Sequence, residues 1–483
     1  MVDDNQSSRI GEQNRRRFIK AVTGSSVALA TGLAGCSGGG SGGDGGDGGD
    51  GGDGGDMGDG GTQTTNQANG DTNGGETTVK IGALYPLSGN LAQLGEESFR
   101  GVELAVEERN ANGGVNGAQI ELVQKDAPDA NSGVSAVESL TNVENVDVIA
   151  GSYSSTISRA STQRAAGFNM PYWELGAVAD VITQENPGNT FRTNPMASFF
   201  GESGVATTEE VIAPALEKSV EDMNVAVMYE SGAYGNSVGG TVKSLSEEAG
   251  MNVVADIEYD AGTSDLSSSI QKLKSADVDV INHTGYSSDI YLLWNQSEDL
   301  DNYIPAAVGN GGGYSLQAFV ENIGTQTALG VFNEDFTQYN TNPEYAPGIE
   351  EFVGTYSEAY GDPPLSGHSL ANYFGMNVLL DTLAQMDSPS DFTLSEMKDA
   401  ALSLDREVGT SATSWGVSFE EGTLQNTRTT VTGHQWQADT YSDDIWHPDR
   451  TDGTADLYTL YPDEGRLDFA EVKNVPRPEY HQQ

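Results

Sequence analysis

Short apolar runs alternate with stretches of helical periodicity from residue 78 to about residue 308. The runs that predict strands cover residues 79–85, 119–123, 146–150, 171–173, 225–229, 252–257, 278–282 and 304–308. Between them, apolar residues recur at helical spacing, as Phe99, Val102 and Val106 do at i, i+3 and i+7. The helices predicted in this way cover residues 134–140, 157–166, 237–248, 266–273 and 290–300, with a first one around 99–112.

A break near residue 174–224 divides this alternation into two series of strand and helix. Two such series indicate an α/β fold of two doubly wound parallel-sheet lobes, with helices on both faces of each sheet. In such sheets ligands bind beyond the carboxyl ends of the strands. The loops expected there are rich in Ser, Thr, Tyr, Gly and Asn, and they cover residues 85–95, 151–156, 174–180, 230–236, 283–289 and 309–314. These neutral groups suit a small polar ligand better than a phosphate or a metal.

The first 36 residues have the features of an export signal. Residues 14–20 resemble the twin-arginine signal, with its arginine pair at Arg15 and Arg16. The weakly apolar stretch 21–35 is too short to span the roughly 30 Å of hydrocarbon in a membrane, so it is typical of a signal peptide. It ends at Cys36 in a sequence that resembles the lipobox of exported lipoproteins. We expect residues 1–36 to be a twin-arginine lipoprotein signal peptide with an acylated Cys36; the alternative is a cysteine buried in an apolar segment.

Residues 37–77 form a low-complexity segment in which Asp recurs every third residue among glycines from 44 to 56. This pattern offers no apolar face, and it predicts a flexible tether. A coil of this length would span about 35 Å root-mean-square. A calcium-binding nonapeptide repeat would need an interleaved apolar position, which is absent. The segment therefore predicts a spacer between a membrane anchor and the globular body.

The charge of the chain is strongly acidic, with 72 Asp and Glu against 23 Lys and Arg and a net charge of −49. Binding to nucleic acid requires basic residues that displace counterions from phosphates, so we expect no nucleic-acid partner. Such a surface is typical of a protein that works in concentrated salt, where repulsion is screened within about 3 Å at 1 M. The alternatives are a halophilic source and an unusually acidic mesophilic protein, and we favour the first.

The sequence contains no recognisable catalytic or metal-binding motif. The histidines, at positions 283, 368, 434, 447 and 481, show no metal-ligand spacing. The G-x-S-x-G patterns within residues 35–43 lie in the predicted signal and tether, where they cannot form a nucleophile elbow. We therefore expect neither an enzyme nor a metal or cofactor, and the alternative is a pair of carboxylates like that of a cell-surface hydrolase.

Several segments of the body resemble one known family in the right order. They are the strand and turn at 81–89, the helix end at 101–117, the loop 151–156, and the Tyr-Gly and Gly-Tyr pairs at 234–235 and 285–286. Through these segments, residues 78–436 resemble the branched-chain amino-acid (leucine/isoleucine/valine) family of type I periplasmic binding proteins. The resemblance implies a substrate-binding protein of an ABC importer. Together with the predicted acylation of Cys36, it predicts an extracellular protein anchored by lipid at the outer face of the cytoplasmic membrane.

The family's architecture implies two lobes joined by a three-segment hinge. By register, the first lobe would hold residues 78–195 and 335–408, and the second would hold 196–334 and 409–483. The lobes would close around a ligand and present a composite surface to the transporter's membrane subunits. We expect a monomer. The tail 441–483 lies beyond the resemblance, and it either extends the second lobe or covers it.

The family's ligand contacts can be carried over residue by residue. Ser155 would bind the ligand's α-carboxylate together with the N-terminus of the following helix, although Ser154 or Ser155 could instead cap that helix. The other ligand-binding residues implied by the resemblance are Ser154, Tyr153 at the pocket floor, Gly176 through its backbone, and Tyr234 and Tyr286 as covers from the second lobe.

The sequence departs from the family where an amino-acid ligand's ammonium is bound. The family's Thr corresponds to Val178 and its Glu to Gly311, so the usual side-chain partners of the ammonium are missing. A buried ammonium needs another partner, and the candidates are Glu174, Glu334 and Asp335. His368 occupies the place of an aromatic pocket wall, and Leu94 often corresponds to a larger ring.

The sequence thus predicts a receptor for a branched-chain-type amino acid. Within the same class, the alternative ligand is an amide, a urea-like compound or a small carboxylate. From other classes, a sensory ligand-binding domain and a cell-surface hydrolase remain open.

Overall fold

The computed structural model of the chain describes residues 78–185, 188–438, 455–467 and 470–478. The predicted export arginines Arg15 and Arg16, the lipid-attachment residue Cys36 and the tether 37–77 lie outside the described residues. None of the helices in the described ranges combines the length and apolar character needed to cross a bilayer.

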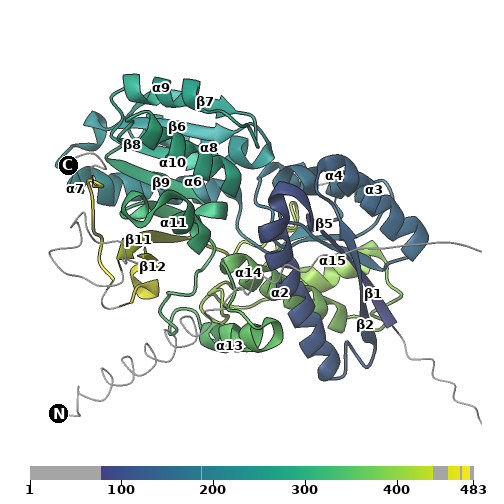
Figure 1. Ribbon diagram of the computed structural model, residues 1–483. Helices are drawn as coiled ribbons and strands as arrows, with labels where there is room; N and C mark the ends of the chain where they lie inside the picture. Colours follow the sequence, from purple (N-terminus) through teal and green to yellow (C-terminus); the bar gives the residue numbers. More distant parts are fainter. Residues whose placement is uncertain (1–77, 186–187, 439–454, 468–469, 479–483) are drawn as a thin grey trace, which may run out of the picture. The chain divides into compact units, whose positions relative to one another are not determined.

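The first lobe is built on a sheet of five parallel strands (Figure 1). Their order is β2-β1-β3-β4-β5, with bounds β1 (Thr78–Tyr85), β2 (Gln119–Asp126), β3 (Val148–Gly151), β4 (Tyr172–Glu174) and β5 (Thr190–Arg192). The strands β3, β4 and β5 are buried at every position. Continuous burial is typical of parallel strands whose sheet is covered on both faces.

Helices of the first lobe come from two distant parts of the chain. They are α2 (Ala92–Ala111), α3 (Ala130–Ser139), α4 (Ser155–Ala166), α5 (Val181–Gln184), α13 (Ile349–Tyr360), α14 (Gly367–Ala384) and α15 (Leu394–Ser403). Helix α14 packs closely along α2, and most of its side chains are buried. An apolar helix of this kind is a core helix rather than a surface helix.

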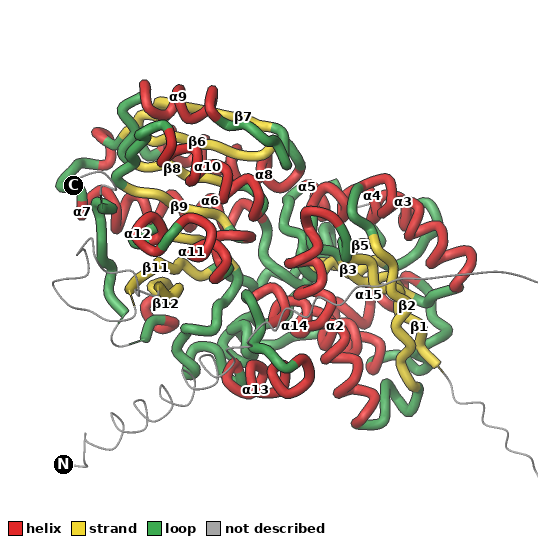
Figure 2. The backbone as a smooth tube through the Cα atoms, viewed as in Figure 1, coloured by secondary structure: helices red, strands yellow, loops and turns green. Residues whose placement is uncertain are grey.

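The second lobe is built on a seven-stranded sheet of order β12-β11-β10-β9-β8-β6-β7. The strands β6 (Asn224–Glu230), β7 (Asn252–Tyr259), β8 (Val280–Thr284), β9 (Ala306–Asn310) and β10 (Phe332–Asp335) are parallel, whereas β11 (Thr432–Ala438) and β12 (Ala455–Tyr461) are antiparallel. Its helices are α6 (Ala197–Thr207), α7 (Ala213–Ala215), α8 (Ala233–Glu248), α9 (Ser267–Ser275), α10 (Ser287–Asp299), α11 (Gln317–Ile323) and α12 (Thr325–Ala328). Figure 2 shows helices on both sides of this sheet.

The structure confirms the predicted α/β fold with two parallel-sheet lobes. Every strand and helix predicted between 79 and 308 occurs, with ends shifted by a few residues. The sequence pattern missed β5 and β10, which are short and have no clear periodicity, and it missed the antiparallel pair β11 and β12.

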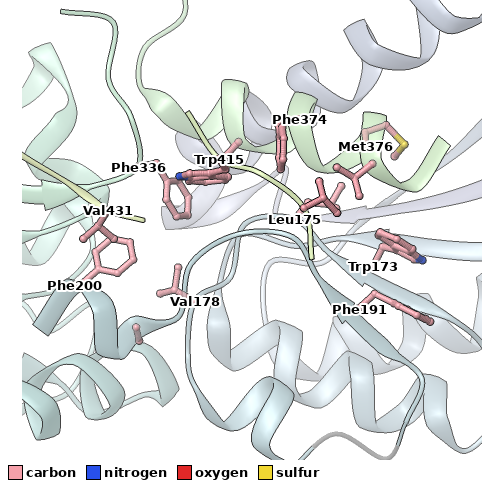
Figure 3. Close-up of a cluster of buried hydrophobic side chains, with 14 of the residues drawn as sticks. Trp173, Leu175, Val178, Phe191, Phe200, Phe336, Phe374, Met376, Trp415 and Val431 are labelled. Atoms are coloured by element: carbon pink, nitrogen blue, oxygen red, sulfur yellow. The ribbon is translucent and has the colours of Figure 1, made fainter. Parts of the chain in front are cut away.

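The segment 409–431, which the prediction assigns to the second lobe, has aromatic contacts with the first lobe. Phe419 packs edge-on against Trp173 of the first sheet with ring centroids 5.6 Å apart, and Trp415 packs against Phe374 of α14 at 5.6 Å. Figure 3 shows Trp415 and Phe374 together in this core. The segment therefore belongs to the first lobe, and the chain returns to the second lobe at β11. The burial of these aromatic rings in the core of the first lobe holds the segment there. The order of strands along the sequence does not reveal such contacts.

The described parts of the tail both extend and cover the second lobe. Strand β12 continues the sheet beyond β11. Further along, the guanidinium of Arg477 lies 4.3 Å from the ring centroid of Trp294 on α10, and the hydroxyl of Tyr303 donates to the Arg477 carbonyl. Both alternatives for the tail therefore apply to different parts of it.

Candidate functional site

A pocket lies where the carboxyl ends of strands from the two lobes meet. Side chains and backbone from β3–α4, β4–α5, α6, α8, α10, β9, β10 and α14 surround it. The lining residues are Tyr153, Ser155, Gly176, Val178, Phe200, Tyr234, Tyr286, Gly311, Gly312, Asp335, Phe336 and His368. This location agrees with the rule that ligands of doubly wound sheets bind beyond the carboxyl ends of the strands.

All of the predicted ligand-binding residues except Ser154 and Glu174 line this pocket. Sequence reasoning missed Phe200, Gly312 and Phe336. Phe200 lies on α6 and Phe336 follows β10, in parts of the chain where the strand pattern gave no register. Leu94 does not line the pocket; it packs behind Tyr153.

Ser155 has a hydroxyl hydrogen available to a ligand. Its Oγ accepts the backbone N–H groups of Val178 at 3.2 Å and of Ala179 at 3.1 Å. Because these bonds use the oxygen as an acceptor, its own hydrogen is free to donate into the pocket. Ser155 is also the first residue of α4, so the helix N-terminus reinforces an anion site at this point.

Ser154 does not cap α4 through its side chain. Its Oγ lies 3.1 Å from the hydroxyl of Tyr286, across the boundary between the lobes. The ring of Tyr286 in turn lies 6.0 Å from that of Tyr153 and 5.7 Å from that of Tyr234. The hydroxyl of Tyr234 donates to the carbonyl of Asn310 at the end of β9. Tyr286 therefore joins the two lobes directly above the pocket.

Glu174, predicted as a ligand contact, is not among the residues that line the pocket, and its carboxylate holds the neighbouring loops. Its Oε1 accepts the backbone N–H groups of Ser152 (2.8 Å), Gly176 (2.9 Å) and Ala177 (2.6 Å), and its Oε2 accepts the hydroxyl of Ser158. Burial raises the pKa of Glu174 to about 7, against the effect of these hydrogen bonds. These hydrogen bonds fix the loops that carry the pocket.

Arg192 holds the next part of the same loop, and sequence reasoning missed it. Its Nη1 donates to the carbonyls of Val178 at 2.9 Å and Ala179 at 2.7 Å. Its other nitrogens donate to Gln425 at 2.5 Å and Thr183 at 2.8 Å. This fully buried guanidinium ties the pocket loop to the segment 409–431. A buried arginine in a short strand gives no periodic signal in the sequence.

Gly311 lies in a conformation and a space that exclude a side chain. Its φ of 63° is in the left-handed region, which disfavours residues with a Cβ. A Cβ at this position would lie 3.2 Å from the hydroxyl oxygen of Tyr234 and 3.5 Å from Oδ1 of Asp335. Gly311, which stands where the family has Glu, therefore cannot be replaced by Glu unless the surrounding structure rearranges.

Asp335 brings a carboxylate to the same point from the neighbouring strand. Strand β10 runs parallel to β9 with Glu334 opposite Asn310, so Asp335 comes beside Gly311. Its Oδ1 accepts the backbone N–H of Phe336 at 2.7 Å, and its Oδ2 accepts the hydroxyl of Ser315. Burial raises its pKa to about 7. Among the lining residues that the structure describes, Asp335 is the one with a carboxyl group.

Glu334, the third predicted candidate for the ammonium partner, faces away from the pocket. Its carboxylate accepts hydroxyls of Ser203 and Thr207 on α6, the latter at 2.7 Å. Burial also raises the pKa of Glu334 to about 7. Successive residues of a strand point to opposite faces, which separates these two adjacent acids.

His368 forms part of the pocket wall at the start of α14. Its ring lies 5.3 Å from that of Tyr153 and 5.1 Å from that of Phe336, measured between centroids. Burial lowers its pKa to about 4, so the imidazole is neutral at physiological pH. In the part of the chain that the structure describes, no group of three or more His, Cys, Asp and Glu could hold a metal ion.

The chain matches a known family over most of the body just described. A sequence model described as periplasmic binding protein matches residues 78–408. The chain belongs to this family. The Leu/Ile/Val-binding protein homolog 7 of Brucella melitensis is 42% identical over 390 residues, which cover 80% of this chain and 92% of that protein. Homolog 8 of Brucella abortus is 39% identical over 359 residues, 74% of this chain and 88% of that protein.

Solved structures share this fold at low sequence identity. The branched-chain amino acid binding protein LivJ of Streptococcus pneumoniae, in complex with isoleucine, has a TM-score of 0.63 at 22% identity and covers 80% of this chain and 100% of that one. A binding protein of Rhodopseudomonas palustris, in complex with 3,4-dihydroxybenzoic acid, has a TM-score of 0.64 at 18% identity and covers 82% and 98%. Proteins of this fold thus bind both amino acids and aromatic acids.

The family confirms the predicted class of the protein. The protein is the substrate-binding protein of an ABC transporter, of a type that acts outside the cytoplasm. The family is non-enzymatic, which confirms the prediction that this chain is not an enzyme.

Proposed function

We propose that this protein captures an amino acid of branched-chain size in the pocket between its lobes and delivers it to an ABC importer. The observation that carries the proposal is the presence of Ser155 and Asp335 in one pocket. Ser155 and the N-terminus of α4 offer donors to an α-carboxylate. Asp335 offers a negative charge to an α-ammonium.

Asp335 supplies the partner that the sequence lacks at Gly311. A charge buried in a closed cleft requires an opposite charge or hydrogen-bond partners. The Asp335 carboxylate lies beside the Cα of Gly311, so the acid comes from β10 instead of the loop after β9. Because β10 supplies the acid, the pocket keeps a site for a zwitterion although the chain lacks the family's Glu.

The remainder of the pocket is apolar and aromatic, with Val178, Phe200 and Phe336 among its walls. These walls suit a side chain of the size of valine or leucine, and the relatives from Brucella carry Leu/Ile/Val-binding names.

The second candidate ligand is an amide, a urea-like compound or a small carboxylate. Val178 supports it, because this residue offers no hydroxyl to an ammonium. A pocket with Ser155 but a protonated Asp335 could hold a neutral amide or a carboxylic acid, as other proteins of this fold hold hydroxybenzoates.

The ligand is best identified by thermal-shift screening against amino acids, amides and small aromatic acids, followed by calorimetry. A ligand at 100 times its Kd should stabilise the protein by about 2.7 kcal/mol. We expect the largest shifts from amino acids of branched-chain size. Shifts from amides or simple carboxylates alone would establish the second candidate instead.

The lobes are proposed to close around the ligand as two bodies. On the contacts of residues 409–431 with the first lobe, the proposed bodies are 78–195 with 335–431, and 196–334 with 432–478. The Ser154–Tyr286 contact supports this proposal because it joins the lobes over the pocket. We further propose that the closed face docks on the membrane subunits of the transporter.

The anchor and export route are proposed from the sequence alone. Arg15 and Arg16 support twin-arginine export, and Cys36 supports lipid attachment at the outer face of the cytoplasmic membrane. In the native host, Cys36→Ser should release the protein from membranes or leave it unprocessed, and Arg15→Lys with Arg16→Lys should retain folded protein inside the cell. Unchanged membrane attachment of Cys36→Ser would refute the lipoprotein assignment.

A further inference from the structure

The imidazole of His368 is oriented by the residue that caps its own helix. Ser366 is the N-cap of α14, and its Oγ accepts the backbone N–H of His368 at 3.3 Å. The same Oγ lies 3.2 Å from Nδ1 of the imidazole. Tyr153 and Phe336 pack against the ring and restrict its rotation.

These contacts decide which ring nitrogen carries the hydrogen. A neutral imidazole has one N–H donor and one acceptor nitrogen. If Nδ1 were the donor, the hydroxyl hydrogen of Ser366 would have no acceptor among the described residues, and Ser366 is fully buried. The arrangement that satisfies both groups has the Ser366 hydroxyl donating to Nδ1, because a buried donor without an acceptor is destabilising. The hydrogen of the imidazole is therefore on Nε2.

Nε2 has no hydrogen-bond partner among the residues that the structure describes. It is also not one of the unpartnered polar atoms that are sealed from solvent, and His368 lines the pocket. The pocket thus contains a fixed N–H donor on a third element, α14, separate from Ser155 on α4 and Asp335 on β10. An aliphatic side chain would leave this donor unpaired when the pocket closes.

We propose that His368 selects ligands whose side chain carries a hydrogen-bond acceptor, so that this receptor prefers a hydroxylated amino acid to its aliphatic counterpart. This inference rests on the proposed function, because it assigns Ser155 and Asp335 to the two ends of an amino acid and His368 to its side chain. Threonine and valine provide the test, since they have nearly the same shape and differ by a hydroxyl in place of a methyl group. A site with a buried donor discriminates strongly against a ligand that lacks the acceptor.

The experiment is calorimetric titration of the full-length protein with threonine and with valine. We expect the wild type to bind threonine at least about tenfold more tightly than valine. His368→Phe keeps an aromatic wall but removes the donor, so the ratio of the two Kd values should fall to about one or reverse. His368→Gln, which retains an N–H donor, should restore part of the preference. Tyr373→Phe is the matched control, because it removes a hydroxyl from the same helix α14 at a position that does not line the pocket, and it should leave the ratio unchanged.

The outcomes separate this inference from the function on which it rests. If both amino acids bind and His368→Phe weakens them equally or not at all, His368 does not contact the side chain and the inference is wrong, while the proposed function stands. If the wild type binds valine as tightly as threonine, the inference is also wrong, even where the phenylalanine variant fails to fold. If the wild type binds no amino acid, both are wrong.

Discussion

Replacing Asp335 by Asn tests the proposed zwitterion site most directly. The change removes the negative charge but keeps nearly the same shape. The amide oxygen can still accept the backbone N–H of Phe336, and the amide nitrogen can donate to the hydroxyl of Ser315, the two groups that Asp335 contacts now. A ligand ammonium would lose its charged partner within an otherwise intact pocket.

The expected loss of affinity follows from the burial of this carboxylate. Removing one partner of a buried, hydrogen-bonded charge pair weakens binding by about 2–5 kcal/mol, or roughly 30- to 5,000-fold in Kd. A ligand without an ammonium should be affected little or even gain affinity. Glu334→Gln is the matched control: it is the adjacent buried acid, but it faces α6 instead of the pocket. Its effect on Kd should be small.

The same residue should make amino-acid binding depend on pH. Burial raises the pKa of Asp335 to about 7, so below pH 7 the carboxyl is increasingly protonated and cannot pair with an ammonium. The Kd of the wild type should therefore rise by about tenfold per pH unit below 7, whereas Asp335→Asn should show a flat profile over that range.

The stability of the ligand-free protein should change with pH in the opposite sense. An unfolded Asp releases its proton near pH 4, whereas folded Asp335 releases it at about pH 7. The folded state binds more protons in this window, so the contribution of Asp335 to the free energy of unfolding falls as the pH rises from 4 to 7. The Asp335→Asn variant should not show this loss of stability, and its melting temperature at pH 8 should not be lower than that of the wild type.

Titration calorimetry of the wild type and both variants between pH 5 and 8 measures these effects. The assignment is refuted if Asp335→Asn binds the amino acid within threefold of the wild type, or if Glu334→Gln is equally damaging. A wild-type Kd that stays constant from pH 8 to pH 5 would also contradict it.

Further predictions concern the other groups of the site and the surface. Ser155→Ala should weaken a carboxylate ligand by about 1–3 kcal/mol, measured by calorimetry. Ser154→Ala should weaken it less, because the Ser154 hydroxyl bonds Tyr286 and the residue does not line the pocket; equal effects would contradict the assignment. Arg192→Met should lower the free energy of unfolding by about 3 kcal/mol in denaturant titrations, since it leaves buried carbonyls without their donor; an unchanged midpoint would refute this. The melting temperature should rise steeply with ionic strength because a charge of −49 is self-repulsive, and a flat profile up to molar salt would count against a halophilic surface.

The sequence alone determined the class of fold and most of the pocket. Parallel strands buried on both faces produce apolar runs that are visible without a structure, and ligand-binding loops follow the ends of such strands. The loops 151–156, 174–180, 230–236 and 283–289 were therefore expected at the pocket, and the family resemblance pointed to Tyr153, Ser155, Gly176, Tyr234 and Tyr286 within them. Glu174 has the same position relative to a strand end but does not line the pocket, because position does not reveal which partners a side chain binds.

Only the tertiary structure decided which acid lies in the pocket and which ring nitrogen of His368 is free. Glu334 and Asp335 are adjacent in sequence, but the pairing of β10 with β9 turns one toward α6 and the other toward Gly311. In the same way, the segment 409–431 belongs to the first lobe because Trp415 and Phe419 are buried there. These facts depend on contacts between residues far apart in the chain, and periodicity along the sequence reports only which side of an element is buried, not what it is buried against.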